Sequence, residues 1–391
     1  MNKKCNICGN KFIDFLSLGM HPCADTFLKT SYRAKNLKKY PLVVGYCKCS
    51  HLSSIYPVPK FERYEKYQYS YTSDNSKVSR LHFKKIASYV CKKFNLNKNC
   101  FVVEAGSNDG TFLYEVKKNS NAKVLGVDPS KNISRLASKK KIRTMVTYFN
   151  LNSSKKIIKN FGYADVLYGA NVFNHVDDNL DFLNGARHLL KKNGILILEV
   201  PDLNSLIYKI GFDTIYHEHR HYFSEKSINR ILKRKGFYIK KVEKINYMSG
   251  SIRVFASKNR SFQPKKNYRF ITLKEFSNFK KKTFKIIKEI KKFVQNHTNV
   301  VCIGAATKGN TLLNCCKFTD KNIKFIVDSS KYKINKYTPG SSIKIIKETK
   351  NIDANALLIL PWNITNHLLK KNFFKKKMPY TSILKEYKNI K

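Results

Sequence analysis

The segment Tyr216–Tyr222 reads Tyr-His-Glu-His-Arg-His-Tyr and holds three of the ten histidines of the chain. Histidine is the one side chain whose ordinary pKa lies in the physiological range. A carboxylate and two phenols stand in the same short segment. A lone histidine is more often a core residue with its hydrogen bonds made, or part of a solvated loop, than a functional residue. This density of proton-carrying groups instead predicts a site of proton transfer.

The stretches that must position this cluster alternate between strand and helix patterns. Apolar runs at 100–104, 123–127, 164–169 and 194–200 alternate with helical patterns such as 79–94 and 178–191. Such alternation is typical of a parallel, doubly wound α/β sheet. After a basic helical segment at 273–295, the pattern restarts with apolar runs at 299–303, 324–327 and 356–360.

The length of 391 residues exceeds what one ordinary core supports. We therefore predict three domains. A small N-terminal domain spans 1–72, a central α/β domain spans 73–248, and a second α/β domain spans 249–391.

The loop at 105–110 follows the first central strand and reads Ala-Gly-Ser-Asn-Asp-Gly. Ligands of open α/β sheets bind beyond the carboxyl ends of the strands. Asp128 ends the next strand and could accept both hydroxyls of a ribose. Acidic flanks without a lysine argue against a phosphate and suit S-adenosylmethionine, which carries an amine and a sulfonium. The predicted cofactor-binding residues are Glu104, Gly106, Ser107, Asn108, Gly110, Asp128 and Asn171.

A second histidine is expected in the same cleft as the cluster. His175 follows the strand at 164–169, and the next strand ends at 199–202, shortly before the cluster. Because the carboxyl ends of parallel strands lie at one edge of the sheet, we expect His175 near the sulfonium end of the cofactor.

Two cysteine pairs bracket the N-terminal domain and predict a structural zinc site. Cys5 and Cys8 have the usual two-residue spacer, whereas Cys47 and Cys49 have a spacer of one residue. His51 and Cys23 are alternative ligands. The competing interpretation is a set of buried free thiols that pack as small hydrophobic residues.

The formal charge of +50 at pH 7 comes mainly from lysines spread along the whole chain. We interpret it mainly as a solvated surface and secondarily as a preference for an anionic substrate. A nucleic-acid-binding protein is the alternative that this charge invites, but the chain has no recognisable nucleic-acid motif. No apolar signal core or membrane span of about 18 residues is present. We therefore expect a soluble cytoplasmic protein with no membrane partner, as a monomer or weak homo-oligomer.

Together these motifs give a family resemblance that covers nearly the whole chain. The chain resembles the three-domain sugar C-methyltransferases that act on nucleotide-linked 4-keto-deoxysugars. The matching segments are 103–110, 171–178, 212–219, 250–254 and 304–314, and Tyr-His-Glu-His at 216–219 is the most specific. The resemblance implies a zinc-binding N-terminal domain, a central class I Rossmann-like methyltransferase domain, and a C-terminal Rossmann-like domain that helps hold the nucleotide sugar.

The resemblance also implies roles for individual side chains. His219 would remove the proton at C3 of the sugar, with Tyr216 and Glu218 orienting it or the substrate. His175 would contact the ketone or enolate oxygen. A tyrosine of the 67–71 stretch would close the site: we select Tyr71, with Tyr67 and Tyr69 as alternatives. Phe149 would pack on the adenine, unless it is a plain core aromatic residue.

Three further residues are candidates for the substrate's diphosphate. Lys308 and Asn310 lie in the glycine-containing turn after the strand at 299–303, where charge and backbone amides could meet a phosphate. Arg253 is a third candidate for the same task.

Two rival activities share many of these residues. O-methylation of a sugar or other small-molecule hydroxyl would use the same cofactor loop and a base, but no ketone. A metal site made from His217, His219 and His221 would arise if these alternate residues shared one face of an extended strand.

Overall fold

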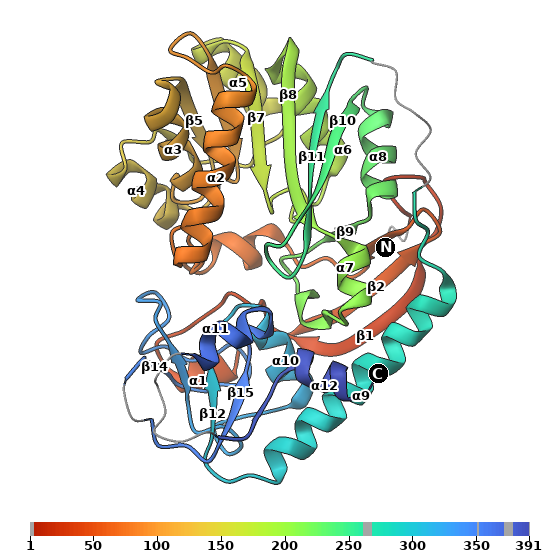
Figure 1. Cartoon of the computed structure of the whole chain (residues 1–391), viewed down its shortest axis with the longest axis vertical. Coiled ribbons are helices and arrows are strands. Elements are labelled where there is room, and N and C mark those ends of the chain that lie inside the picture. The colour runs from red at the N-terminus through yellow and green to blue at the C-terminus, as the bar shows by residue number, and fades with distance from the viewer. Residues whose placement is uncertain (1–3, 261–267, 350–351, 371–377, 391) are drawn as a thin grey trace.

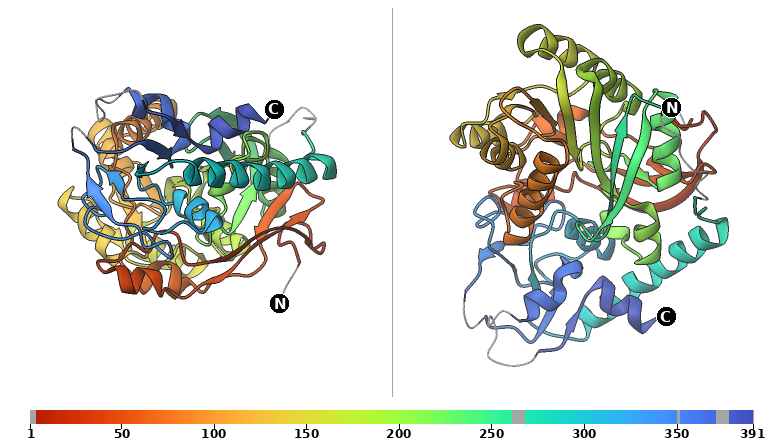
Figure 2. Two further views of the ribbon diagram at one scale, coloured as in Figure 1. Left: turned by 90° about the horizontal axis from the view of Figure 1, so that it is seen from below. Right: turned by 45° about the horizontal axis from the view of Figure 1, so that its top comes forward.

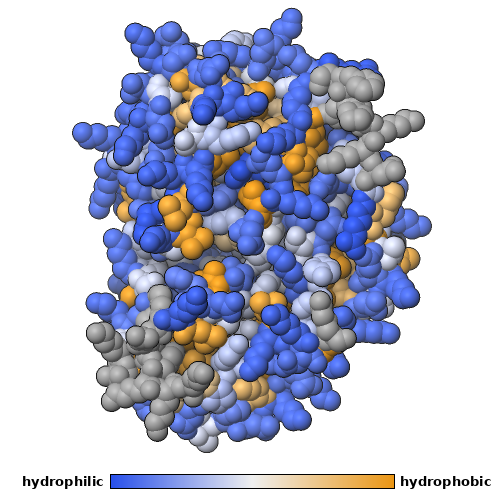
Figure 3. All heavy atoms as spheres, viewed as in Figure 1, coloured by the Kyte–Doolittle hydropathy of each residue, from blue (hydrophilic) through white to orange (hydrophobic). Residues whose placement is uncertain are grey.

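The computed structural model describes residues 4–260, 268–349, 352–370 and 378–390. Three sheets organise this part of the chain, and Figure 1 shows an upper and a lower lobe joined by the N-terminal strands β1 and β2. Within the described residues, no helix combines the length and the apolar character needed to cross a bilayer. Hydrophilic side chains cover most of the face seen in Figure 3, with apolar side chains gathered in small patches.

The N-terminal sheet is antiparallel and has the strand order β1-β2-β3-β9. Its first three strands are close in sequence, but the fourth contains the C-terminal end of the histidine cluster. The strands are β1 (Ile13–His21), β2 (Tyr40–Cys47), β3 (His51–Ser54) and β9 (His221–Phe223), accompanied by α1 (Ser31–Lys35) and the π-helical turn η1 (Phe61–Glu65). The N-terminal sheet is therefore completed by a strand that the sequence analysis assigned to the central domain.

The central sheet has the order β10-β11-β8-β7-β4-β5-β6. All strands but β10 and β11 are parallel, and the order reverses between β4 and β7, where ligands of such sheets bind. The strands are β4 (Phe101–Ala105), β5 (Lys123–Val127), β6 (Thr144–Met145), β7 (Ala164–Ala170), β8 (Leu190–Pro201), β10 (Tyr238–Ile245) and β11 (Ser251–Ser257).

Helices cover both faces of the central sheet, as Figures 1 and 2 show. They are α2 (Lys77–Lys93), α3 (Thr111–Ser120), α4 (Lys131–Lys139), α5 (Leu151–Phe161), α6 (Asn179–Leu189) and α8 (Glu225–Arg234). The helix α7 (Leu203–Tyr208) and the 3-10 turn η2 (Phe212–Thr214) lie instead below the sheet in Figure 1, and α7 contributes to the core shared with the C-terminal helices. Local signals set their starts: Ser76 and Asp178 cap α2 and α6 by accepting hydrogen bonds from backbone N–H groups of the first turn. The predicted α/β architecture is confirmed.

The C-terminal sheet is fully parallel and has the order β14-β13-β12-β15-β16. Its strands are β12 (Val300–Ile303), β13 (Ile326–Asp328), β14 (Ile345–Lys347), β15 (Ala356–Ile359) and β16 (Tyr380–Thr381). The accompanying helices are α9 (Leu273–Gln295), α10 (Gly309–Cys316), η3 (Trp362–Ile364), α11 (Thr365–Leu369) and α12 (Ile383–Asn389). The turn that carries Lys308 follows β12, at the point where this sheet reverses its strand order.

Strand pairing crosses the predicted boundary at residue 248. That boundary falls between β10 and β11, which pair with each other, while β11 also pairs with β8. By pairing, the central sheet runs on to Ser257.

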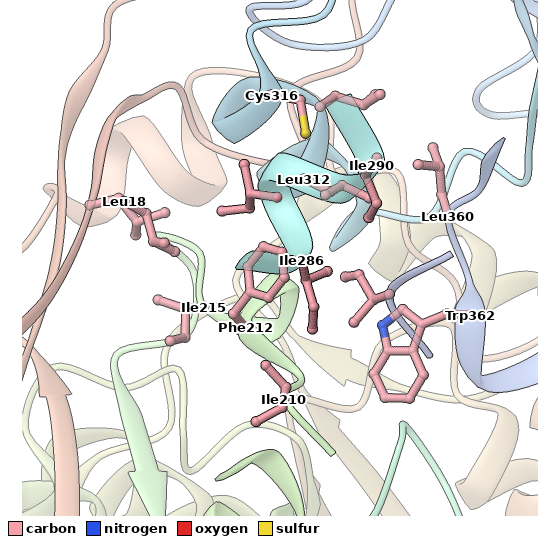
Figure 4. Close-up of a cluster of buried hydrophobic side chains, with 14 of the residues drawn as sticks. Leu18, Ile210, Phe212, Ile215, Ile286, Ile290, Leu312, Cys316, Leu360 and Trp362 are labelled. Carbon is pink, nitrogen blue, oxygen red and sulfur yellow. The ribbon is translucent and has the colours of Figure 1, made fainter. Parts of the chain in front are cut away.

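One hydrophobic core joins all three units. It contains residues of β1 and β2, of α9 and α10, and of the segment that leads into the histidine cluster. Figure 4 shows Leu18, Phe212, Ile215, Ile286 and Leu312 facing one another in this core. Phe212 and Ile215 are fully buried there. Side chains of all three units therefore hold the segment that precedes the histidine cluster in the chain.

Candidate active site

The histidine cluster is a buried turn held at both ends. Its N-terminal end follows η2 and the core residue Ile215, and its C-terminal end is β9, where His221 pairs with Ser53 of β3. Residues 217 to 221 are all buried. The segment is thus buried rather than solvated, and only its end, from His221 onward, is an extended strand.

The three imidazoles of the cluster point to different partners. His217 Nε2 lies 3.0 Å from the carbonyl oxygen of His21, and His221 Nδ1 lies 3.2 Å from Ser53 Oγ. His219 turns to a third site, described below. The proposed metal site of these three residues is wrong, because among the described residues only the four N-terminal cysteines converge closely enough to hold an ion. The turn between Tyr216 and Arg220 breaks the alternation on which that hypothesis depended.

His219 is held as a neutral base. Its Nδ1 lies 2.8 Å from the carbonyl oxygen of Thr214, which can only accept, so Nδ1 carries the hydrogen and Nε2 keeps its lone pair. The Tyr216 hydroxyl lies 2.7 Å from Nε2 and donates to it. Burial lowers the pKa of His219 to about 4. Near neutral pH this imidazole is therefore uncharged and able to take a proton.

His175 lies beside His219. The two ring centroids are 4.8 Å apart and the rings meet at 76°. The backbone makes this pairing possible, because the carbonyl oxygen of Asn174 accepts hydrogen bonds from the N–H groups of Arg220 and His221, at 2.8 and 3.0 Å. Burial, with the nearby His219 as a second cause, lowers the pKa of His175 well below its ordinary value. The structure brings together the two histidines that the sequence analysis placed in one cleft.

The pair is accessible from one side. His175 and Tyr216 keep intermediate exposure, whereas His219 is buried behind them. The side of the pair formed by His175 and Tyr216 therefore has partial contact with solvent.

Glu218 faces away from the base. Its carboxylate accepts hydrogen bonds from the backbone N–H groups of Asp25, at 2.9 Å, and Ala24, at 3.3 Å. Burial raises the pKa of Glu218 to about 7. Glu218 thus fixes the cluster to the N-terminal domain and contacts neither ring nitrogen of His219.

Asp25 extends this connection to the C-terminal domain. Its carboxylate accepts from the backbone N–H and the hydroxyl of Ser70, both at 2.7 Å, and from the Thr307 hydroxyl at 2.8 Å. The tyrosine stretch and the turn after β12 therefore meet at the buried Asp25 carboxylate, and the cluster joins the same residue through the Asp25 backbone N–H.

The tyrosines of the 67–71 stretch divide between two places. The Tyr71 hydroxyl lies 3.3 Å from the Tyr247 hydroxyl, and its carbonyl oxygen accepts from Asn108 Nδ2. Tyr71 thus lies beside the cofactor loop and makes no hydrogen bond to either imidazole. The Tyr69 ring contacts the Tyr64 ring at an angle of 59°, with 5.9 Å between the centroids. Tyr64, rather than Tyr69, reaches the imidazole pair: its hydroxyl lies 2.8 Å from His175 Nδ1.

Sequence reasoning missed Tyr64. It lies in η1, a short turn in which Phe61 is exposed and Arg63 is buried. No periodicity or motif separates it from the other tyrosines nearby, so only the tertiary contact identifies it.

The glycine loop after β4 has the geometry of a cofactor cradle. Gly106 and Gly110 have φ values of 67° and 72°, in the left-handed region that favours glycine. The Asp128 carboxylate accepts from the backbone N–H groups of Asn108 and Ser130, at 3.0 and 2.8 Å. Burial raises the pKa of Glu104 well above its ordinary value.

Two buried polar atoms of this loop have no partner. These are Glu104 Oε2 and Ser107 Oγ. A buried acceptor without a donor indicates a missing ligand group, and these atoms at the carboxyl end of β4 fit the amine and hydroxyl groups of S-adenosylmethionine. Asn171 follows β7 with a φ of 52°, and its N–H donates to the carbonyl oxygen of Glu199.

Two of the predicted cofactor residues have protein partners instead. Asn108 Oδ1 accepts from the N–H of Ser73 at 2.8 Å, so the Asn108 side chain holds the linker into the central domain. The Phe149 ring packs edge-on against Phe182, at 4.9 Å, and is buried in the core. Its packing on the adenine stays a prediction.

Gly106→Ala is expected to weaken binding of S-adenosylmethionine at least about tenfold. A Cβ at this position would lie 2.8 Å from Val172 Cβ, so Val172 must move, and with it the loop that carries His175. The left-handed φ adds a cost of about 1–2 kcal/mol. Calorimetric titration measures the affinity. Gly162→Ala is the control, because it has a positive φ but no atom within 4 Å of the added Cβ. Equal affinities in both variants would contradict the prediction.

The four N-terminal cysteines fit a tetrahedral zinc ion. Their sulfur atoms all lie within 4.8 Å of one another, with Cys5 and Cys49 at 3.8 Å and Cys8 and Cys47 at 3.3 Å. Zn–S bonds of about 2.3 Å in a tetrahedron require sulfur separations of about 3.8 Å.

The short Cys47–Cys49 spacing is accommodated by the turn between β2 and β3. Ser50, in that turn, has a φ of 60°, and its N–H donates to the carbonyl oxygen of Cys47. Neither alternative ligand is needed: His51 Nδ1 lies 3.4 Å from Cys5 Sγ, outside the thiolate set. Cys23 is buried near Glu218, and burial is the main cause that raises its thiol pKa.

The three predicted substrate-binding side chains do not converge. Asn310 Nδ2 donates to the carbonyl oxygen of Ala24 at 2.7 Å. Arg253 Nε and Nη1 bind the carboxylates of Glu199 and Glu243, at 2.6 and 3.0 Å. These donors are already satisfied by the protein, so the structure gives no support for a diphosphate at either residue.

Lys308 bridges the two lobes. Its Nζ lies 3.0 Å from Ser249 Oγ, 3.6 Å from Asp213 Oδ2 and 4.2 Å from the centre of the Trp362 ring. Burial lowers the pKa of Lys308. It lies at the strand-order reversal of the C-terminal sheet but has a carboxylate partner of its own.

His217 is expected to make the stability of the protein fall in acid. Burial lowers its pKa to about 4, against 6.5 for the exposed side chain. Between these values the unfolded chain binds a proton that the folded chain does not, so the contribution is complete above pH 6.5 and is lost as the pH falls towards 4.

The variant His217→Gln keeps a donor for the His21 carbonyl oxygen and cannot be charged. We compare the free energy of unfolding of the variant with that of the wild type at two pH values. The variant should gain on the order of 2 kcal/mol over the wild type when the pH falls from 7 to 5. Denaturant unfolding at both pH values measures this. A difference that does not change with pH would show that His217 does not titrate with folding.

Comparison with known proteins finds three family models that match successive parts of the chain. Residues 5–62 match a family model described as a zinc binding domain. Residues 77–242 match one described as a methyltransferase domain, and residues 247–378 match one described as a C-methyltransferase C-terminal domain.

The chain is similar along almost its full length to C-methyltransferase NovU of Streptomyces niveus. The two are 27% identical over 390 residues, which covers 94% of this chain and 91% of the relative. Solved structures overlap with about half of the chain. Magnesium protoporphyrin IX methyltransferase from Synechocystis is 18% identical over 47% of this chain and 88% of its own, with a TM-score of 0.38. Geranyl diphosphate C-methyltransferase from Streptomyces coelicolor is 11% identical over 47% and 80%, with a TM-score of 0.37.

Proposed function

We propose that the chain uses S-adenosylmethionine to methylate C3 of a nucleotide-linked 4-keto-deoxysugar, with His219 as the base. Three matching family models and the similarity to a C-methyltransferase along almost the full length of the chain support this proposal. The observation that carries this proposal is the pairing of the His219 and His175 rings, whose centroids lie 4.8 Å apart. A carbon beside a ketone loses its proton only if a base and a stabiliser of the enolate oxygen are both in place.

His219 supplies the base. Its Nε2 lone pair takes the C3 proton, and the electron pair of that C–H bond moves into an enolate with the charge on the C4 oxygen. The Tyr216 hydroxyl donates to this lone pair in the free protein, so the Tyr216 side chain must move aside before C3 of the substrate can approach Nε2. The nearby negative enolate stabilises the imidazolium, which offsets the effect of burial on the pKa of His219.

His175 is placed to stabilise the enolate oxygen, because an uncharged imidazole can donate one hydrogen bond. When bound, S-adenosylmethionine supplies a methyl group on a positively charged sulfur. The residues of the glycine loop and Asp128 would hold it at the carboxyl ends of β4 and β5. The carbon nucleophile forms when His219 removes the proton, so proton removal and carbon methylation depend on the same imidazole.

The substrate class rests on the family resemblance and on the position of the C-terminal sheet. The turn after β12 contacts the site through Thr307 and Asp25. A nucleotide carried by the C-terminal unit would therefore place an attached sugar near the imidazole pair.

The test is a substrate panel. The protein is incubated with methyl-labelled S-adenosylmethionine and dTDP-, GDP- and CDP-linked 4-keto-deoxyhexoses, in deuterated water. We expect one sugar to gain a methyl group on carbon and to exchange its C3 hydrogen with solvent. A methyl group on oxygen, without exchange at C3, would overturn the proposal in favour of an O-methyltransferase.

A further inference from the structure

Tyr64 and Arg63 of η1 form a contact with His175 that the proposed mechanism does not use. The Tyr64 hydroxyl lies 2.8 Å from His175 Nδ1. Arg63 Nη1 donates to the carbonyl oxygen of His175 at 3.0 Å and to the Tyr64 hydroxyl oxygen at 3.4 Å. One side chain thus holds the backbone of His175, and its neighbour holds the ring.

The direction of the hydrogen bond between Tyr64 and His175 follows from these contacts. The Tyr64 oxygen already accepts from Arg63, so its single hydrogen is free to be donated. Two acceptors are in reach: His175 Nδ1 at 2.8 Å and the carbonyl oxygen of Glu218 at 3.4 Å. The shorter contact favours Nδ1. In a neutral imidazole one nitrogen accepts and the other donates, so Nδ1 accepts and Nε2 carries the hydrogen.

The neighbouring histidine has the opposite arrangement. His219 donates through Nδ1 to the carbonyl oxygen of Thr214 and keeps its lone pair on Nε2. The two rings, 4.8 Å apart between centroids, would then offer the substrate one donor, His175 Nε2–H, and one acceptor, His219 Nε2, once the Tyr216 hydroxyl has moved aside. Two identical side chains acquire different roles because their outer nitrogens meet different partners.

We propose that Tyr64, supported by Arg63, is a positioning residue that keeps His175 in the Nε2–H form, so that it donates to the substrate oxygen while His219 accepts the proton. This inference rests on the proposed function. It adds the residue pair that distinguishes the two imidazoles.

The support for Tyr64 is rigid. The Arg63 side chain is fully buried, and its Nη2 binds both carboxylate oxygens of Asp177, at 2.7 and 2.8 Å. Asp177 also accepts from Arg220 Nε at 2.9 Å. One carboxylate therefore ties η1 to the His175 loop and to the histidine cluster. A displaced Arg63 would release both the carbonyl oxygen and the ring of His175.

The first test reads the hydrogen positions directly. The full-length, zinc-loaded protein is labelled with ¹⁵N in its histidines, and the ring signals are assigned with His175→Gln and His219→Gln. We expect the hydrogen of His175 on Nε2 and that of His219 on Nδ1 in the wild type. In Tyr64→Phe, the signals of His175 should shift towards the other form. A wild-type protein with the hydrogen of His175 on Nδ1 would overturn the inference, whatever the behaviour of Tyr64→Phe.

The second test is kinetic. Tyr64→Phe is expected to lower kcat by about 10- to 100-fold with little change in the KM for S-adenosylmethionine, because only the enolate contact is lost. Tyr148→Phe is the matched control, since the Tyr148 hydroxyl binds Glu65 at the exposed side of η1. Wild-type turnover in Tyr64→Phe would overturn the inference. Failure of the proposed function has a separate signature: no sugar of the panel gains a carbon-bound methyl group with the wild-type protein.

Discussion

His219→Gln is expected to lower the rate of methyl transfer by about 10²- to 10⁴-fold and to stop exchange of the substrate's C3 hydrogen with solvent. The glutamine amide can still donate to the carbonyl oxygen of Thr214 and accept from Tyr216, the two hydrogen bonds that His219 makes. What it cannot do is take a proton. The loss should therefore appear in kcat, while the affinity for S-adenosylmethionine stays near that of the wild type.

A matched control stands two residues earlier. His217→Gln makes the same change in a ring that faces the carbonyl oxygen of His21, away from the imidazole pair. It should turn over at close to the wild-type rate at pH 7. Deuterium incorporation, measured by mass spectrometry without S-adenosylmethionine, separates proton removal from methyl transfer. Undiminished exchange in His219→Gln would assign the base to another side chain.

Loss of the zinc site is expected to abolish activity although the site is not part of the catalytic pocket. Cys8→Ser removes one of four converging sulfurs. Zinc binding contributes about 10–16 kcal/mol in isolated zinc-finger peptides, so the N-terminal sheet should lose its fold. Since β3 of that sheet pairs with β9, the histidine cluster then loses the anchor at its C-terminal end.

Three measurements check this chain of effects. Metal analysis should give one zinc per wild-type chain and none in Cys8→Ser. Hydrogen exchange should show faster exchange at the amides of β9, and activity should be lost in parallel. Cys100→Ser is the control, because Cys100 is partly exposed like Cys8 but does not belong to the sulfur cluster. A zinc-free Cys8→Ser variant with slow exchange at β9 would contradict the proposed link.

The sequence predicted those parts of the molecule that local signals specify. Continuous apolar runs identified β4, β5, β7 and β8, because buried parallel strands need apolar side chains on both faces. The glycine loop and the aspartate after β5 are also local, since each depends on its own turn. The cysteine pairs predicted a zinc site, but only the turn at Ser50 shows how the short spacer fits.

Features that depend on distant contacts could not be predicted from the sequence. Three residues, His221–Phe223, are too few to be recognised as a strand, and they pair only because β3 offers a free edge. The direction of each imidazole in the cluster is set by a carbonyl oxygen or hydroxyl remote in the chain. Arg253 and Asn310 looked available to a substrate because their partners, Glu199 and Ala24, belong to other parts of the fold.

The pairing of β9 with β3 also limits how relatives of this chain can exchange parts. A crossover between two genes near residue 72 would combine one parent's first three strands with the other parent's fourth strand. Asp25 and Glu218 would then come from different parents, although the backbone N–H of Asp25 donates a hydrogen bond to the Glu218 carboxylate. Hybrid proteins should function only if residues 1–72 and the Tyr216–Phe223 segment come from the same parent. These two stretches are far apart in the sequence but must be exchanged together.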